Sequence, residues 1–154
     1  MKWRVIPMTE SHVAAVVLLE RSTPGAAHWT PAAYAERLVA PADLSAMVNI
    51  ALVAIESNTV IGFVVGRAVA REVELENIVV AESHRRQGVG AALLDQFMHE
   101  CERHRCESMH LEVRSSNEGA REFYQRGGFS ESGTRGNYYA NPVEDAVVMG
   151  RAIP

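Results

Sequence analysis

The segment over residues 85–91 combines two arginines with two closely spaced glycines. Gly88 and Gly90 lack a Cβ atom, so an anionic group can approach their backbone closely. If a helix begins here, its first N–H groups have no partner within the helix, and the partial positive charge at that end attracts phosphate. Arg85 and Arg86 would add charge beside these amides. The segment therefore predicts a pyrophosphate-binding turn between a strand and a helix.

Two common pyrophosphate motifs do not fit this turn. A P-loop requires Gly-Lys followed by Ser or Thr, and this combination does not occur in the sequence. A dinucleotide fingerprint requires a third glycine, but that position is Leu93, and the preceding strand falls mid-chain after a predicted hairpin. A Gly-x-Gly pair alone is a weak signal, whereas the whole run from Arg85 to Ala91 is more specific.

A candidate proton acceptor lies in a predicted strand downstream of the turn. Residues 109–113 alternate apolar and polar side chains, which is typical of a half-buried strand. Along such a strand Glu112 shares a face with His110 and Arg114. The spacing alone leaves two interpretations open: a solvated strand face, or a carboxylate that acts as a general base.

A candidate proton donor follows on a predicted short helix. Asn117 suits the N-cap of that helix, and Tyr124 lies seven residues further along. This separation is two turns, or about 10.5 Å along one helix face. Tyr124 could pack in the core beside Phe123, or it could donate a proton to a departing thiolate. The usual pKa of a phenol, about 10, lies above that of a thiol at about 8.5, so a phenol stays protonated at neutral pH.

Other titratable side chains have simpler interpretations. Glu72, Glu74 and Glu76 alternate along a strand and share a face, which is usually solvated but would attract a basic acceptor if it lined a groove. The remaining groups are not spaced as metal ligands, so no metal is expected. Surface positions are expected for His84, His99 and His104, and reduced packing positions for the two cysteines, Cys101 and Cys106.

Hydrophobic spacing predicts strands and helices on both sides of the turn. Strands are expected over residues 3–6, 49–55, 60–69, 73–80 and 109–113, with closing strands within 138–153 that are interrupted at Asn141-Pro142. Helices are expected after Thr9, with Val13, Val16, Val17 and Glu20 on one side, after Thr30-Pro31, over residues 88–104, and from Asn117 to Gly127-Gly128. Pro24-Gly25 and Pro41 should punctuate the N-terminal helical region. The pattern indicates an α/β domain on one central sheet.

Composition narrows the class of partner. The chain has 154 residues and a formal net charge of -4, and no linker or repeat divides it, so residues 1–154 are expected to form one domain. An acidic chain is a poor match to nucleic acid, which requires a basic surface. The first residues lack the apolar run of a signal peptide, and no apolar stretch approaches the roughly 20 residues that span a bilayer. We therefore expect a cytoplasmic protein without membrane or nucleic-acid partners.

The run from Arg85 to Ala91 resembles the Arg/Gln-x-x-Gly-x-Gly/Ala pattern of the GNAT superfamily of N-acetyltransferases. The likeness continues through the segments 111–117 and 124–129, and through Asn137-Tyr138-Tyr139 and Glu144-Asp145-Ala146. Together these segments look like those of the bacterial ribosomal-protein-alanine N-acetyltransferases. The resemblance extends from about residue 77 to residue 149 and fades over the first 50 residues.

This resemblance implies a GNAT fold, with a mixed, mostly antiparallel central sheet flanked by helices, and acetyl-CoA as co-substrate. It implies a catalytic glutamate at Glu112, a proton donor at Tyr124 and a cofactor contact at Asn117. Tyr138 and Tyr139 match a segment that borders the acceptor groove, and we assign Glu76 of the acidic strand to the same groove. The implied cofactor contacts, apart from Asn117 and Tyr124, are Ile78, Val79, Val80, Arg85, Arg86, Gln87, Gly88, Val89, Gly90 and Ala91.

The expected reaction is transfer of acetyl to the N-terminal α-amine of a protein. By resemblance, the acceptor is a small-subunit ribosomal protein that begins with alanine. Two rivals remain: acetylation of a small amine or antibiotic on the same fold, and a non-catalytic module that binds coenzyme A as a sensor. The joint presence of Glu112 and Tyr124 argues against the sensor.

Overall fold

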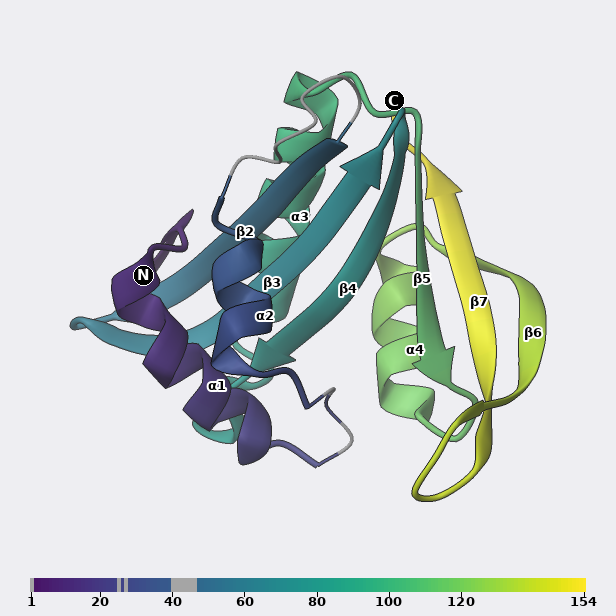
Figure 1. Ribbon diagram of the computed structural model, residues 1–154, viewed down its shortest axis with the longest axis horizontal. Helices are drawn as coiled ribbons and strands as arrows, with labels where there is room; N and C mark the ends of the chain where they lie inside the picture. Colours follow the sequence, from purple (N-terminus) through teal and green to yellow (C-terminus); the bar gives the residue numbers. More distant parts are fainter. Residues whose placement is uncertain (1, 25, 27, 40–46) are drawn as a thin grey trace.

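Alternating apolar runs of the chain form the strands of one sheet. The computed structural model describes residues 2–24, 26, 28–39 and 47–154, and within them a seven-stranded sheet has the order β1-β2-β3-β4-β5-β7-β6 (Figure 1). The strands are β1 (Trp3–Pro7), β2 (Met47–Glu56), β3 (Thr59–Val69), β4 (Glu72–Val80), β5 (Ser108–Arg114), β6 (Ser130–Tyr139) and β7 (Glu144–Ala152). Among these strands, β4 and β5 form the parallel pair and the other neighbours are antiparallel.

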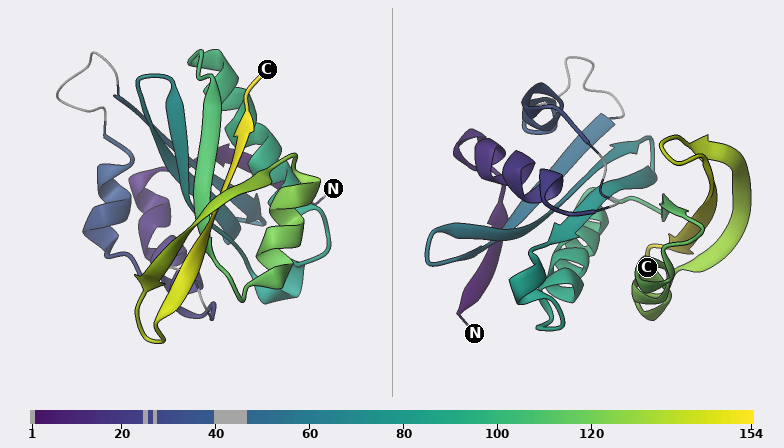
Figure 2. Two further views of the ribbon diagram at one scale, coloured as in Figure 1. Left: turned by 90° about the vertical axis from the view of Figure 1, so that its right-hand side faces the viewer. Right: turned by 90° about the horizontal axis from the view of Figure 1, so that it is seen from below.

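Helices cover both faces of the sheet (Figure 2). They are α1 (Val13–Arg21), α2 (Pro31–Glu36), α3 (Val89–Arg103) and α4 (Glu118–Arg126). One apolar core joins α1 and α2 to the sheet around Val16, Tyr34 and Phe63. The other joins α3 and α4 to the opposite face around Phe97 and Leu111. Each buried aromatic or branched side chain of these cores contributes about 1.5–3 kcal/mol relative to an exposed one.

Helix starts follow the capping residues in the sequence. The Thr30 hydroxyl accepts a hydrogen bond from the Ala33 amide at 3.1 Å, and Pro31 occupies the first helical position of α2. Thr9 precedes a short 3-10 turn, Glu10–His12, that leads into α1. These two expectations are confirmed, whereas the expected breaks at Gly25 and Pro41 lie outside the described residues.

A β-bulge in β4 changes which side chains share a face. Val65 of β3 pairs with Asn77, but the next residue, Gly66, pairs with Leu75, so Glu76 is the additional residue. After the bulge, Asn77 lies on the same side of the sheet as Glu76 and belongs with the α1/α2 face. Bulges also increase the local twist of a strand.

Just before this bulge, β4 and β5 separate. They pair at three positions, from Glu72 opposite Ser108 to Glu74 opposite His110, and then diverge (Figure 1). The edge of β4 from Leu75 to Val80 therefore faces β5 without forming a ladder with it. This split is where a ligand can reach the middle of the sheet.

The fold class expected from the sequence is confirmed, including the mixed, mostly antiparallel sheet. The last strand, β7, lies within the expected range, but the expected start of the preceding strand is wrong, because β6 begins at Ser130 rather than near Tyr138. Nearly all residues of β6 are exposed, and the first eight are polar residues or glycine, so the strand lacks the apolar alternation by which a strand is recognised.

Candidate active site

A cavity of about 510 Å³ lies in the split between β4 and β5. Its walls come from β4 and β5, from the tyrosines at the end of β6, and from the segment between α1 and α2. It brings together the sequence-predicted residues Glu76, Ile78, Val79, Glu112, Asn117, Tyr124, Tyr138 and Tyr139.

A second cavity, of about 400 Å³, lies over the turn between β4 and α3. The predicted cofactor residues that line it are Ile78, Val80, Arg85, Arg86, Gly88, Gly90, Ala91 and Tyr124. The two cavities share Ile78, Ala120 and Tyr124 in their walls. Together they form a path from the turn, past Tyr124, to Glu112.

The backbone of the turn is arranged to present N–H groups. Arg86 and Gly88 both have positive φ angles, 61° and 84°, and Gly88 is the N-cap of α3 without a side-chain cap. The Ala92 amide donates to the Gly88 carbonyl at 3.0 Å, whereas the amides of residues 86–91 have no hydrogen-bond partner within the described residues. Such a helix start favours an anion.

Two predicted residues of the turn do not line the smaller cavity with their side chains. The Val89 side chain is buried in the core under α3. The Gln87 side chain donates to the Ser83 carbonyl at 3.2 Å. Gly90 packs against α4, since an added Cβ would lie 3.2 Å from the Phe123 ring. The turn is thus held between β4 and α4.

Glu112 lies on the cavity side of β5, and its side chain is 12% exposed. Its Oε1 atom forms an ion pair with Arg135 Nε at 2.9 Å. A hydrogen bond to Glu112, followed by burial, raises the pKa of Tyr138 to about 12. Arg135 and Tyr138 both come from β6. The Glu112 carboxylate therefore has a cation and a phenol beside it.

Tyr124 is 7% exposed and lies on α4 between Phe123 and Phe129. Burial, and to a lesser extent Tyr139, raises the pKa of Tyr124 above its usual value near 10. The phenol therefore stays protonated at neutral pH, as a proton donor requires. Its strength as an acid is lower than the sequence alone suggested, because burial penalises the phenolate.

Asn117 combines a structural position with a place at the cavity. Its side-chain oxygen accepts from the Ala120 amide at 3.1 Å and caps α4. The residue also lines the larger cavity. The N-cap interpretation is confirmed, while a cofactor contact stays a prediction.

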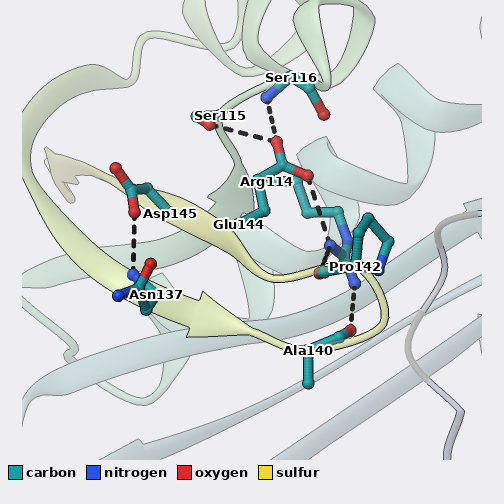
Figure 3. A network of polar contacts seen from close by, with 8 residues as sticks. All are labelled: Arg114, Ser115, Ser116, Asn137, Ala140, Pro142, Glu144 and Asp145. Atoms are coloured by element: carbon teal, nitrogen blue, oxygen red, sulfur yellow. Dashed lines mark hydrogen bonds and ion pairs between the residues drawn. The ribbon is translucent and has the colours of Figure 1, made fainter.

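A polar network holds the β6–β7 hairpin that carries the two tyrosines (Figure 3). Glu144 Oε2 accepts from the Ser116 amide, and Arg114 bonds the Ala140 and Pro142 carbonyls at 3.2 and 3.1 Å. Hydrogen bonds from Ser116, and then from Arg114, lower the pKa of Glu144 to about 2. Arg114 also stacks 4.5 Å from the Tyr139 ring centroid.

Glu76 does not offer a free carboxylate to the cavity. Its two oxygens each accept from Arg37, at 2.8 Å, and both side chains are nearly buried. Glu74 is more open and lies 3.8 Å from His110. Burial is the largest cause that raises the pKa of Glu74, followed by repulsion from Glu76.

Sequence reasoning missed Arg135. The family resemblance placed the region of Trp29 at the acceptor pocket but gave that residue no role of its own. Arg135 is on the strand that the pattern missed, and Trp29 is in a segment without periodicity. His84 was expected at the surface, but it is half-buried, pairs with Glu56 and lines the smaller cavity. Its partner is distant in sequence, so spacing could not reveal it.

Neither a metal centre nor a disulfide is seen near the cavities. Among residues 2–24, 26, 28–39 and 47–154, no group of three or more His, Cys, Asp or Glu side chains is arranged to hold a metal ion. Cys101 and Cys106 are buried and free. Within those same ranges, no helix is both long and apolar enough to span a membrane.

Comparison with known proteins defines the class. The acetyltransferase (GNAT) family matches residues 15–129, which is most of the chain, and the chain therefore belongs to this family.

The chain is similar to named enzymes within that family. The ribosomal protein bS18-alanine N-acetyltransferase of Escherichia coli (strain K12) is 39% identical over 93 residues, which cover 59% of this chain and 63% of the relative. The enzyme of the same name from Haemophilus influenzae is 38% identical over 98 residues, 62% of this chain and 66% of the relative. The matches thus span slightly less than two thirds of each relative's length.

Solved structures agree over nearly the full chain. The ribosomal-protein-S18-alanine N-acetyltransferase of Escherichia coli superposes with a TM-score of 0.83 at 27% identity, covering 98% of this chain and 94% of the other. Ard1 of Thermoplasma volcanium gives 0.84 at 25% identity over 100% and 99%. The NatC complex bound to Gag peptide and CoA gives 0.82 at 18% identity over 100% of both chains, which shows the shared fold alone.

Proposed function

We propose that this chain transfers acetyl from acetyl-CoA to the N-terminal α-amine of a protein, the acceptor being a small-subunit ribosomal protein that begins with alanine. The observation that carries the proposal is the continuity of the two cavities. An anion-binding turn lies at one end, Glu112 lies at the other, and Tyr124 borders both. The names of the similar enzymes support the choice of acceptor.

The turn is assigned to the cofactor. Its free amides from Arg86 to Ala91 would hold the pyrophosphate, with Arg85 adding charge, and no metal is needed for this contact. The edge of β4 from Ile78 to Val80, which does not pair with β5, would form hydrogen bonds with the amides of the pantetheine arm. A residue with a buried side chain, such as Val89, also fits this assignment, because the proposed contact needs only its backbone amide.

Glu112 and Tyr124 are assigned to the two proton transfers. The acceptor nitrogen attacks the thioester carbonyl carbon, the carbon–sulfur bond breaks, and coenzyme A leaves as a thiolate. Glu112 takes the proton that the ammonium must lose before attack, and Tyr124 gives its proton to the thiolate. A second proton, lost from nitrogen as the amide forms, restores the phenol, and Glu112 passes the first proton to water.

The charge of the cavity favours a cationic acceptor. Glu74 and Glu112 face the same space, and Glu76 adds a third carboxylate that Arg37 balances. An α-amine has a pKa of about 8, so roughly a tenth is neutral at pH 7, whereas a lysine with a pKa near 10.4 is almost wholly charged. A single carboxylate base is therefore better matched to an N-terminus.

The test is release of thiol from acetyl-CoA with three acceptors: a hexapeptide that begins with alanine, a lysine peptide with a blocked N-terminus, and spermidine. Turnover with the hexapeptide alone is expected. Turnover with spermidine alone would support a small-amine acetyltransferase, and binding of acetyl-CoA without any turnover would support a sensor.

A further inference from the structure

Glu20, in the last turn of α1, is a buried carboxyl group with 0% exposure. Its Oε1 atom accepts hydrogen bonds from the Trp29 amide at 2.8 Å and from the Tyr34 hydroxyl at 2.9 Å. Its Oε2 atom has no hydrogen-bond partner in the part of the chain that the structure describes. Because an incompletely bonded buried carboxyl group costs free energy, stability alone does not explain Glu20.

The hydrogen bonds continue from Glu20 to the active-site strand. The Tyr34 hydroxyl accepts from Asn77 Nδ2 at 2.9 Å. Tyr34 is fully buried, and Asn77 is the first residue of β4 after the bulge at Glu76. The chain of contacts therefore connects α1 and α2 to the wall of the larger cavity.

A second connection runs in parallel through Arg37. Its guanidinium group bonds both oxygens of Glu76 at 2.8 Å and lies 4.9 Å from the centroid of the Trp29 ring. The Trp29 ring is also 5.1 Å from the Tyr34 ring. The indole thus contacts two side chains that are each bonded to β4, while the Trp29 backbone amide is bonded to Glu20.

We propose that Glu20 and Arg37 are positioning residues that fix Trp29 as a rigid wall of the acceptor cavity, and that this wall limits the size of the acceptor's first side chain. Trp29 lines the same cavity as Glu112 and Tyr124. A wall with two anchors cannot move aside for a large side chain, so it selects by steric overlap. The inference rests on the proposed function, since it requires the acceptor amine to enter this cavity.

The first test measures whether the anchors immobilise Trp29. The chain has two tryptophans, so Trp3→Phe leaves Trp29 as the sole indole fluorophore. In that background, Tyr34→Phe and Arg37→Gln are expected to raise the acrylamide quenching constant by about twofold or more, because local opening exposes the ring. Glu107→Gln, which alters an exposed ion pair with Arg71, is the matched control and should change nothing.

Glu20 itself is tested by two substitutions in the same background. Glu20→Gln keeps an oxygen acceptor for the Trp29 amide and should leave quenching near the parent value. Glu20→Leu removes the acceptor and should raise it. If the leucine variant does not fold, Tyr34→Phe and Arg37→Gln still decide the point, and an unchanged quenching constant in both would overturn the proposal.

The second test measures selectivity. The ratio of kcat/KM for a peptide that begins with alanine to that for one that begins with leucine is expected to fall by about tenfold or more in Trp29→Ala, a size of effect typical of apolar pockets. The KM for acetyl-CoA should not change, and Trp29→Phe should retain most of the preference. An unchanged ratio in Trp29→Ala would also overturn the proposal.

Failure of the proposed function gives a different result. If the parent protein acetylates no peptide but does acetylate small amines, the acceptor assignment is wrong. A series of primary amines of increasing size then replaces the peptides in the selectivity test. A size limit that Trp29→Ala removes would support the wall, and a limit that persists would exclude it.

Discussion

The Glu112 carboxylate pairs with Arg135 and lies beside the Tyr138 phenol, and both of these side chains come from the exposed strand β6. A carboxylate that accepts a proton from a substrate must exchange one of these partners for the substrate nitrogen. Arg135 is the partner that can leave at little cost, because its side chain is 58% exposed and water can replace the ion pair. The ammonium group of the acceptor would then replace the Arg135 guanidinium beside Glu112, so that one cation takes the place of another.

Glu112→Gln is expected to lower kcat by about 10²–10⁴-fold, because the amide cannot accept the proton. The loss should be largest at low pH, where the acceptor is fully protonated, and should shrink as pH rises through the pKa of the amine. Steady-state rates across a pH series, with the affinity for acetyl-CoA measured in parallel, check both points. A pH–rate profile identical to that of the parent would remove Glu112 as the base.

Tyr124→Phe is expected to slow the chemical step by about 10²–10⁴-fold if the phenol protonates the thiolate. Since the ring stays between Phe123 and Phe129, folding should be little affected. Tyr139→Phe is the matched control, and it should alter the KM for the acceptor with little change in kcat. Full single-turnover activity in Tyr124→Phe would rule out the role.

The β6–β7 hairpin places the tyrosines of the cavity, and Glu144 fixes the hairpin to the loop after β5. Ser115 and Ser116 donate to its Oε2 atom, and Arg114 lies 3.4 Å from its Oε1 atom. These contacts favour the ionised form, so they strengthen when the carboxyl group is charged. The hairpin is therefore an element whose attachment depends on pH.

Glu144→Gln is expected to lower the midpoint of thermal unfolding at neutral pH. The pKa of Glu144 falls on folding from its ordinary 4.5 to about 2, so the ionised group stabilises the fold above the higher value, and this stabilisation is lost as pH falls between the two. Unfolding curves of both proteins across that range should therefore converge. A difference that stays constant with pH would show that the charge of Glu144 is not responsible.

At the scale of elements, the sequence predicted the helices and strands whose apolar residues recur at regular spacing. It missed the features that depend on contacts between distant segments. The strand β5 and the helix α3 were found because their apolar residues recur at fixed spacing. The bulge at Glu76 was not, since it arises from the register of β4 against β3. The residues of the turn could be named from their types, but Arg135 and Trp29 reach the cavity only through tertiary packing.

The whole molecule is built around the separation of β4 from β5. Three paired positions connect two larger parts of the sheet, one formed by β1 to β4 and the other by β5 to β7. α3 packs on the first part and α4 on the second, as two views of the molecule show (Figure 2). The cavities occupy the space between these parts.

Coenzyme A bound in the split between β4 and β5 would therefore contact both parts of the sheet and hold them together. Amide hydrogens from Leu75 to Val80 that lack a neighbouring strand on this side, together with those of the turn, should exchange with deuterium more slowly once the ligand is present. The exchange rates of amides in β1 and β2, which are far from the split, provide the internal reference. If exchange slows equally in all strands, or does not slow at the split, the two parts of the sheet do not depend on the ligand to stay together.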